Sequence, residues 1–240
     1  MNFNKREIKI MTFNIQHCEH YIEHKINFNT IAEAVKNSGA DIVGLNEVRG
    51  KGISTEYENQ TGILSELTGL ENQYFAKAID FDGVNPYGNA LLTRYALKSA
   101  ETIVIPDPAP KTGCAYYETR CILKAKLENS LTVMVVHFGL NEDEQKNAVD
   151  MIIKNMETEK CILMGDFNVT PDNAVLNPIR ERMKDAADCF EGALFSFPSD
   201  RPDRKIDYIF ATPDIKIIKA DIPDMTVSDH RPHTAVISIE

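Results

Sequence analysis

Two apolar runs typical of β-strands lie close together near the middle of the chain. CILKAKL (121–127) and LTVMVV (131–136) are separated only by Glu128-Asn129-Ser130, a pattern typical of a β-hairpin. Strands joined by so short a turn are antiparallel, because parallel neighbours need a long crossover between them. The pair therefore excludes a fold built only from alternating strands and helices and predicts mixed sheets.

Six further short runs with β-type composition are spread along the chain, and two helix-like stretches lie between the early ones. The runs are IKIMTF (8–13), DIVGL (41–45), ALLT (90–93), CILM (161–164), DYIFAT (207–212) and HTAVISI (233–239). The helix-like stretches are NTIAEAVKNSG (29–39), with an apolar face and a Ser-Gly stop, and QTGILSELTGL (60–70). We expect an α/β fold with helices outside the sheets. The Pro-rich and polar segments 106–113 and 197–205 are expected to be surface loops.

Length and composition indicate an ordinary globular protein. A chain of 240 residues can bury a core as one unit, so we expect residues 1–240 to form a single domain and a monomer. No apolar stretch approaches the roughly 20 residues of a membrane span. The charged start is followed by no apolar signal region, so the expected location is cytoplasmic. The five scattered cysteines include no C-x-x-C pair, which favours reduced thiols over disulfides or a zinc knuckle.

The charge balance bears on the partner. The formal net charge is −10, and such a chain lacks the basic field expected of a protein that binds long duplexes through many phosphates. A small substrate, or one bound through metal ions, fits this charge better than a nucleic acid does.

Polar residues capable of chemistry stand at the ends of the apolar runs. They are Asn14, Asn46-Glu47, His137, Asp166 with Asn168, Asp207, and Asp229-His230. If these ends meet at one edge of the sheets, they line a cleft with two kinds of chemistry. The carboxylate and amide oxygens suit Mg²⁺ or Mn²⁺, and a histidine with an acidic partner suits proton transfer.

Seven motifs in sequence order carry a family resemblance. They are TFNIQ (12–16), GLNEV (44–48), YGNALLTR (87–94), VHFGL (136–140), GDFN (165–168), IDYIF (206–210) and SDH (228–230). Together they resemble the endonuclease/exonuclease/phosphatase superfamily, which includes DNase I, apurinic endonucleases, neutral sphingomyelinases and inositol polyphosphate 5-phosphatases. The resemblance covers nearly the whole chain. It implies the four-layer DNase I-like fold, a two-sheet β-sandwich core with flanking helices.

The resemblance implies a metal site. Glu47 matches the main Mg²⁺ ligand of the family, with Asn14 beside it and Asp229 close to the metal. The implied cofactor is Mg²⁺ or Mn²⁺. Gln16 stands where several members have Asp or Asn, so a second metal ion is less assured.

The resemblance also implies catalytic roles. Asp166 and Asn168 would hold and polarise the attacking water and the phosphate. His230 would contact the phosphate or transfer a proton, with Asp207 fixing the orientation of its ring. His137 matches the second histidine of DNase-like and sphingomyelinase-like members, and would protonate or bind the leaving group from the other side.

Two further residues match family positions that touch phosphate. Asn89 stands in YGN and Arg120 in E-x-R, and either could instead be structural. Each site residue also has an ordinary alternative, since acids at strand ends are mostly solvated and Asp and Asn favour turns. The complete set of motifs favours the functional interpretation.

The segment HCEHYIEH (17–24) offers a competing metal site. His20 and His24 are four residues apart and could bind zinc from one face of a helix, with Glu23 nearby. No third ligand is evident in the sequence. The alternative is a loop that shapes access to the cleft.

The sequence therefore favours a metal-dependent hydrolase of a small or lipid-linked phosphodiester. The HFGL motif resembles the H-L-G-L of bacterial members grouped with hydrolases of lipid head groups and small phosphodiesters. A DNA endonuclease or exonuclease is the alternative within enzymes, disfavoured by the acidic balance. A catalytically inactive binding scaffold is the alternative from another class.

Overall fold

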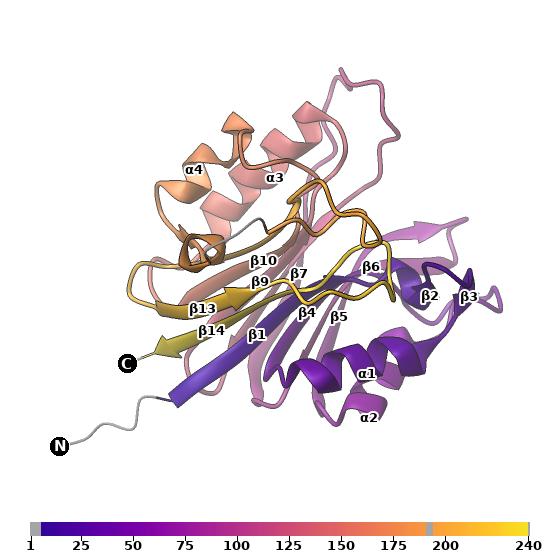
Figure 1. Cartoon of the computed structure of the whole chain (residues 1–240). Helices are drawn as coiled ribbons and strands as arrows, with labels where there is room; N and C mark the ends of the chain where they lie inside the picture. The colour runs from indigo at the N-terminus through magenta and orange to yellow at the C-terminus, as the bar shows by residue number, and fades with distance from the viewer. Residues whose placement is uncertain (1–5, 191–193, 240) are drawn as a thin grey trace.

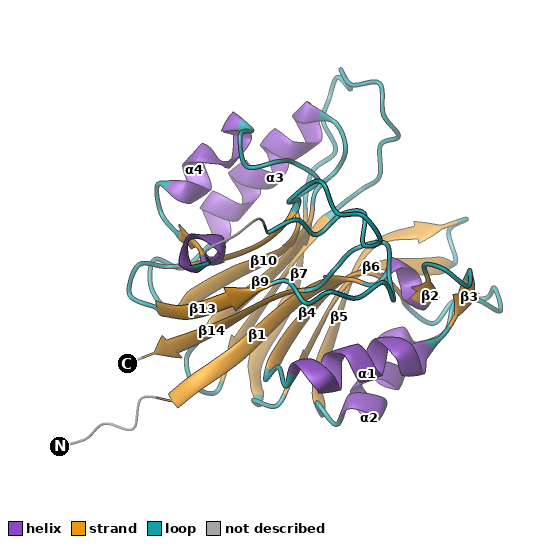
Figure 2. Ribbon diagram, viewed as in Figure 1, coloured by secondary structure: helices purple, strands orange, loops and turns teal. Residues whose placement is uncertain are grey.

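The computed structural model describes residues 6–190 and 194–239, which form the strands and helices drawn in Figures 1 and 2. The strands are β1 Arg6–Asn14, β2 Glu19–His20, β3 Lys25–Ile26, β4 Ile42–Arg49, β5 Asn72–Phe81, β6 Asn85–Thr93, β7 Leu97–Val104, β8 Cys121–Leu127, β9 Thr132–His137, β10 Cys161–Asp166, β11 Lys184–Asp185, β12 Asp207–Ala211, β13 Lys216–Asp221 and β14 His233–Ile239. The α-helices are α1 Phe28–Ser38, α2 Gln60–Thr68, α3 Glu142–Asn155 and α4 Asn177–Arg180. Short 3₁₀ turns cover Gln16–Cys18, Ala174–Leu176 and Ala186–Cys189.

Two six-stranded sheets of matching design make up the core of the described residues. Their strand orders are β13-β14-β1-β4-β6-β5 and β11-β12-β10-β9-β8-β7. Each sheet has one central parallel pair, β1 with β4 and β9 with β10, and antiparallel neighbours on both sides of it. The first and last strands, β1 and β14, are paired side by side.

The layers are helix, sheet, sheet and helix (Figure 1). The central strands are apolar on both faces because each face is covered, and three buried clusters result. The cluster between the sheets includes Ile10, Ile42, Leu91, Val133, Val135, Ile162 and Ile209. A second cluster packs α3 and α4 on the sheet with β9 and β10 and includes Met134, Val136, Val149, Ile152 and Leu163. A third packs α1 and α2 on the other sheet and includes Met11, Phe13, Ile31, Val35 and Leu64.

Most sequence expectations for the fold are confirmed. The two-sheet α/β sandwich with outer helices is present, the predicted hairpin is β8–β9, and the first two predicted helices are α1 and α2. All five cysteines are free. None of the helices in residues 6–190 and 194–239 is long and apolar enough to cross a membrane.

The elements that the sequence did not predict lie at the periphery. Strands β5, β7 and β13 are at or next to sheet edges and are largely half-exposed. Helix α3 (EDEQKNAVDMIIKN) has a polar first half with three acids in its first turn. Because each of these elements buries only one narrow face, its apolar pattern is too weak to stand out in the sequence.

Candidate active site

The carboxyl ends of the central strands of both sheets meet at one place. In one sheet the last paired residues of β1 and β4 are Asn14 and Asn46, and in the other the last pair of β9 and β10 is His137 and Asp166. Amides from the first sheet bind the second. Asn14 Nδ2 donates to Asp166 Oδ2 at 3.1 Å, and Asn46 Nδ2 donates to the carbonyl of Val136 at 2.8 Å. Buried side chains therefore join the two sheets at the floor of the site.

A β-bulge places Glu47 at this edge. The register of β4 against β6 shifts between Leu45 and Val48, which leaves Asn46 and Glu47 opposite the single residue Asn89. A bulge of this kind bends a strand and changes the direction of a side chain. Glu47 has φ of 58°, an uncommon conformation for a residue with a long side chain, which here accompanies the bulge.

Asn89, which was predicted to touch phosphate, is buried behind this bulge. Its Oδ1 accepts a hydrogen bond from Asn46 Nδ2 at 2.8 Å, and its Nδ2 donates to the carbonyl of Cys121 at 3.0 Å. The side chain is 2% exposed. The structure therefore surrounds Asn89 with partners that support the bulge, and contact with phosphate stays a prediction.

Two of the three predicted metal ligands are in contact at the bulge, and the segment that carries the third is held nearby. Asn14 Nδ2 donates to Glu47 Oε1 at 3.0 Å, and Ser228 Oγ donates to the backbone carbonyl of Asn14 at 2.8 Å, which fastens the segment carrying Asp229. Burial raises the pKa of Asp229, and the charge of Glu47 raises it further against the opposing effect of His230. Asn14 turns its nitrogen to Glu47, and its Oδ1 accepts from the backbone N–H of Gln16 at 3.1 Å. The carboxylates of Glu47 and Asp229 are oxygen donors of the kind that suits Mg²⁺ or Mn²⁺, and a metal site at these three residues stays a prediction.

His230 is backed by a carboxylate, as expected. Its Nδ1 lies 2.8 Å from Asp207 Oδ2, and its Nε2 lies 3.6 Å from Asp166 Oδ2. Burial disfavours the charged ring, but the two carboxylates outweigh burial and raise the pKa of His230 to about 10. The ring is therefore an imidazolium at neutral pH.

His137 is backed by a cation instead. Its Nδ1 lies 3.1 Å from Arg120 Nη1, and its Nε2 lies 3.5 Å from Asp166 Oδ2. Burial lowers the pKa of His137 well below its usual value, and the positive charges of Arg120 and His230 lower it further. A guanidinium can only donate, so this contact favours the tautomer in which His137 Nδ1 accepts and Nε2 carries the ring proton.

Arg120 and Asn168, the two side chains next to His137, have further contacts. Arg120 Nη1 is also paired with Glu118, so its predicted contact with phosphate stays a prediction. Asn168 Nδ2 lies 3.2 Å from His137 Nε2 and donates to the carbonyl of Phe138 at 3.0 Å.

The GDFN motif owes its glycine to the close approach of β9. Gly165 has φ of 147°, and a Cβ there would lie 1.8 Å from the carbonyl oxygen of Val136. After it, Phe167 turns into the core while Asn168 N donates to Asp166 Oδ1 at 2.9 Å. Burial raises the pKa of Asp166 to about 7, against the lowering effect of the His230 charge. This apolar strand ends in Gly, Asp, Phe and Asn because each residue type has a separate structural task.

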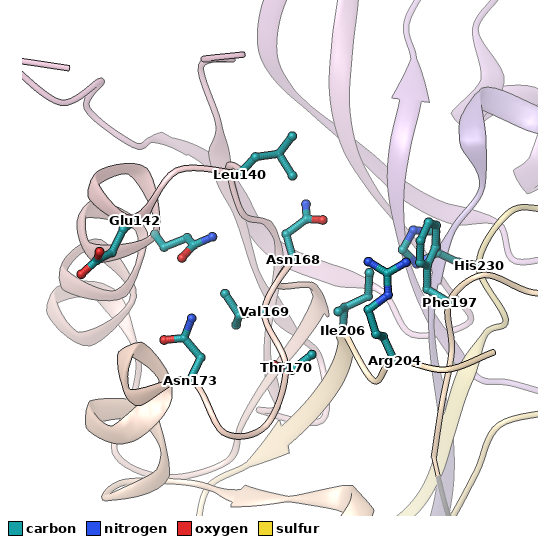
Figure 3. A pocket seen from close by; sticks show the side chains of 11 residues that line it. Leu140, Glu142, Asn168, Val169, Thr170, Asn173, Phe197, Arg204, Ile206 and His230 are labelled. Atoms are coloured by element: carbon teal, nitrogen blue, oxygen red, sulfur yellow. The ribbon is translucent and has the colours of Figure 1, made fainter. Parts of the chain in front are cut away.

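A cavity of about 770 Å³ opens beside His230 and Asn168 (Figure 3). The remaining residues that line it come from the start of α3, the segment after β10 and the segment before β12: Leu140, Glu142, Gln145, Val169, Thr170, Asn173, Phe197, Arg204 and Ile206. Sequence reasoning treated residues 197–205 only as a surface loop and missed Phe197 and Arg204. No spacing in the sequence reveals that this loop reaches His230.

The alternative of a zinc site on a helix that carries His20 and His24 is wrong. The segment carrying His20 and His24 forms the short strands β2 and β3 with a turn between them, and His20 Nδ1 accepts from the backbone N–H of Ile22 at 3.3 Å. Within the described ranges, the His, Cys, Asp and Glu residues whose ligand atoms cluster within 4.8 Å are Asp166, Asp207 and His230.

Comparisons with known proteins agree with this fold. The sequence model described as "Endonuclease/Exonuclease/phosphatase family" matches residues 11–230. The chain is 27% identical over 172 residues to the Escherichia coli K12 protein YbhP, a match that covers 67% of this chain and 66% of that protein. It thus spans just under two thirds of that relative's length.

Two solved structures show the same fold. An endonuclease/exonuclease/phosphatase from Bacteroides vulgatus superposes with a TM-score of 0.77 at 24% identity, covering 98% of this chain and 100% of that one. A mannosyl-6-phosphatase from Bacteroides thetaiotaomicron superposes with a TM-score of 0.77 at 14% identity, covering 96% of this chain and 99% of that one.

Proposed function

Because the chain belongs to the Endonuclease/Exonuclease/phosphatase family, we propose that it is a divalent-metal-dependent hydrolase of a small or lipid-linked phosphodiester. One observation carries the proposal. Asp166 Oδ2 lies 3.1 Å from Asn14, 3.5 Å from His137 and 3.6 Å from His230. The Asn14 amide nitrogen and both histidine rings therefore surround one carboxylate oxygen, where a phosphate and an attacking water can be held together.

The metal would be held by Glu47, Asn14 and Asp229. Bound there, Mg²⁺ or Mn²⁺ would supply positive charge to the phosphate oxygens. The protein's own groups account for the rest. Asp166 accepts a proton from the attacking water, and Asn168 offers an amide to the phosphate without adding negative charge.

The two histidines have the remaining roles in the proposed reaction. His230, oriented by Asp207, carries the proton that the leaving oxygen needs. His137 donates a hydrogen bond to the phosphate from Nε2. This division follows from their partners, a carboxylate behind one ring and a guanidinium behind the other.

The cavity and the charge of the chain favour a small substrate. A volume of about 770 Å³ is in the range of pockets for molecules of drug size, and the net charge of −10 disfavours long polyanions. The likeness to a mannosyl-6-phosphatase supports a small phosphorylated substrate on this fold. We also propose that residues 1–240 act as one domain, because β1 and β14 pair directly.

The test is hydrolysis of bis(p-nitrophenyl) phosphate with Mg²⁺, with Mn²⁺ and with excess EDTA. Turnover should require the metal, and Glu47→Ala should abolish it while the circular dichroism spectrum stays unchanged. Glu71→Ala, at an exposed position, is the matched control and should behave as wild type. Full turnover in excess chelator would contradict the proposal.

The nuclease alternative is tested with the same preparation. Plasmid nicking at enzyme concentrations too low to hydrolyse bis(p-nitrophenyl) phosphate or phospholipid head-group analogues would favour a nuclease. An inactive binding scaffold is disfavoured because Glu47, Asp166, Asn168, Asp207 and His230 are all present around one point.

A further inference from the structure

The loop of residues 196–204, here called the Arg204 loop, is closed by pairing between its ends. Phe197 N donates to the carbonyl of Arg204 and Arg204 N donates to the carbonyl of Phe197, both at 3.1 Å. The two residues thus form an isolated antiparallel bridge. Directly opposed residues of such a pair place their side chains on the same face.

The Arg204 loop is fastened to the segment that carries His230. Ser199 N donates to the carbonyl of Asp229 at 2.7 Å, and Ser199 Oγ donates to the carbonyl of Ser228 at 2.5 Å. From the other side, Arg231 N donates to the carbonyl of Ser196 at 2.7 Å. The position of the loop is therefore set relative to His230 before any ligand binds.

Three side chains of these segments form a stack. The Phe197 ring lies 4.8 Å from the His230 ring, centroid to centroid, with planes tilted by 51°. The Arg204 guanidinium carbon lies 4.9 Å from the Phe197 centroid. A guanidinium near an aromatic ring is attracted to it, so the stack orients Arg204.

The outer part of the guanidinium has no partner in the described part of the chain. Arg204 Nε donates to Asp203 Oδ1 at 3.0 Å, and neither Nη group has a hydrogen bond to a described residue. The side chain is 52% exposed. A planar fork of N–H donors held in place and left open is suited to a carboxylate or phosphate.

The open guanidinium belongs to the same cavity as the proposed catalytic groups. Figure 3 shows Arg204 and His230 on one wall, with Asn168 and Glu142 on the other. Arg204 and His230 are the basic residues among those that line the cavity, and Glu142 would repel an anion on the far wall. An anionic group of a bound molecule is therefore directed to Arg204.

We propose that Arg204 binds a second anionic group, a phosphate or a carboxylate, on a small substrate whose scissile phosphate lies at His230 and Asn168. This inference rests on the proposed function for the position of the scissile phosphate. It makes Arg204 a residue that determines specificity, and it predicts a preference for phosphoesters that carry two negative groups.

The test uses pairs of ligands that differ by one anionic group. The pairs are glycerol 3-phosphate with 3-phosphoglycerate, and fructose 6-phosphate with fructose 1,6-bisphosphate, which differ in the spacing of the two groups. Calorimetric Kd values and inhibition constants against bis(p-nitrophenyl) phosphate are measured for each. In at least one pair the ligand with two anionic groups should bind about 10- to 100-fold more tightly, the range expected for hydrogen bonds between charged groups.

The variant Arg204→Gln should remove that preference and leave binding of the ligand with one anionic group unchanged. Arg201→Gln is the matched control, because Arg201 lies in the same loop with its side chain 91% exposed. It should keep the preference. Arg204→Lys, which keeps the charge without the fork, should keep part of it.

Three results would overturn the inference, and the first two are no preference in either pair and equal weakening of both members by Arg204→Gln. A preference dependent on Arg204 that is seen only with a 5′-phosphorylated dinucleotide would also overturn it, in favour of a nucleic acid substrate. Calorimetry needs no turnover, so a protein that hydrolyses no phosphoester but keeps the Arg204-dependent preference would fail only the proposed function.

Discussion

His230 and His137 lie on either side of Asp166, at 3.6 and 3.5 Å from its Oδ2, yet the groups behind the two rings have opposite charge. Asp207 lies behind His230, and Arg120 lies behind His137. The pKa of the first ring is raised to about 10 and that of the second is lowered. The same side chain at the same cleft is thus a charged acid on one side and a neutral hydrogen-bond donor on the other.

This difference refines what the sequence implied for His137. The second histidine was expected to protonate or bind the leaving group. Because Arg120 occupies Nδ1 with a donor, the ring has a single proton, on Nε2, and little tendency to give it up. The Arg120 contact favours binding over protonation, and leaves proton donation to His230.

The largest effect should come from changing the charge behind His230. Asp207→Asn should lower kcat by roughly 10²–10⁴, as should His230→Ala, because the amide can hold the wrong tautomer and no longer favours the imidazolium. The measurement is kcat on a phosphodiester whose leaving group is an alkoxide, which needs the proton. Asp150→Asn, at an exposed position, is the control. A value for Asp207→Asn within threefold of wild type would remove the distinction between the two sides.

A third histidine sharpens the comparison because the effect of burial on its pKa outweighs that of the carboxylates of Asp185 and Asp207. Burial lowers the pKa of His233, on β14, to about 4 from 6.5. The unfolded chain takes up a proton that the folded chain does not, so stability falls as the pH falls from about 6.5 towards 4. The decrease should reach up to about 3 kcal/mol.

The variant His233→Asn separates this effect from those of other groups. It should flatten the dependence of the free energy of unfolding on pH between about 6.5 and 4, measured by urea denaturation. Its stability at pH 7 can differ from wild type without affecting the conclusion, since the slope is the quantity compared. An unchanged slope would show that burial of His233 does not control acid stability.

The smallest catalytic effect should come from the cation behind His137. Arg120→Gln should lower kcat/KM by about 10- to 100-fold, because a bond that involves a charged donor is lost and the ring can take the other tautomer. Arg94→Gln removes a surface ion pair with Asp41 and is the control. A loss at Arg120 as large as that at Asp207 would mean that the guanidinium binds phosphate directly.

The central strands and the first two outer helices could be predicted from sequence, and the edge strands and helix α3 could not. Strands β9 and β10 are buried on both faces and read as continuous apolar runs. Edge strands such as β7 alternate between half-buried and exposed residues, so their composition resembles that of loops. Apolar periodicity records burial, and the elements buried least were the ones missed.

In the candidate site too, some residues could be predicted from sequence and others could not. Residues at strand ends could be predicted because a motif and a strand together fix both position and direction. Arg204 and Phe197 could not, because their approach to His230 depends on a bridge within the loop and on hydrogen bonds to residues 228–231. The opposite charges of the groups behind the two histidines were also invisible in sequence, since Arg120 and His137 come from different elements.

The most direct test of the central claim is the dependence of each histidine variant on the leaving group. Rates are measured for phosphodiesters whose leaving groups range from p-nitrophenolate, which departs without a proton, to alkoxides, which need one. If His230 donates the proton and His137 only binds the phosphate, the loss caused by His230→Ala should grow steadily with the pKa of the leaving group. The loss caused by His137→Ala should be the same for all of them. A loss that grows for His137→Ala and stays constant for His230→Ala would contradict the account.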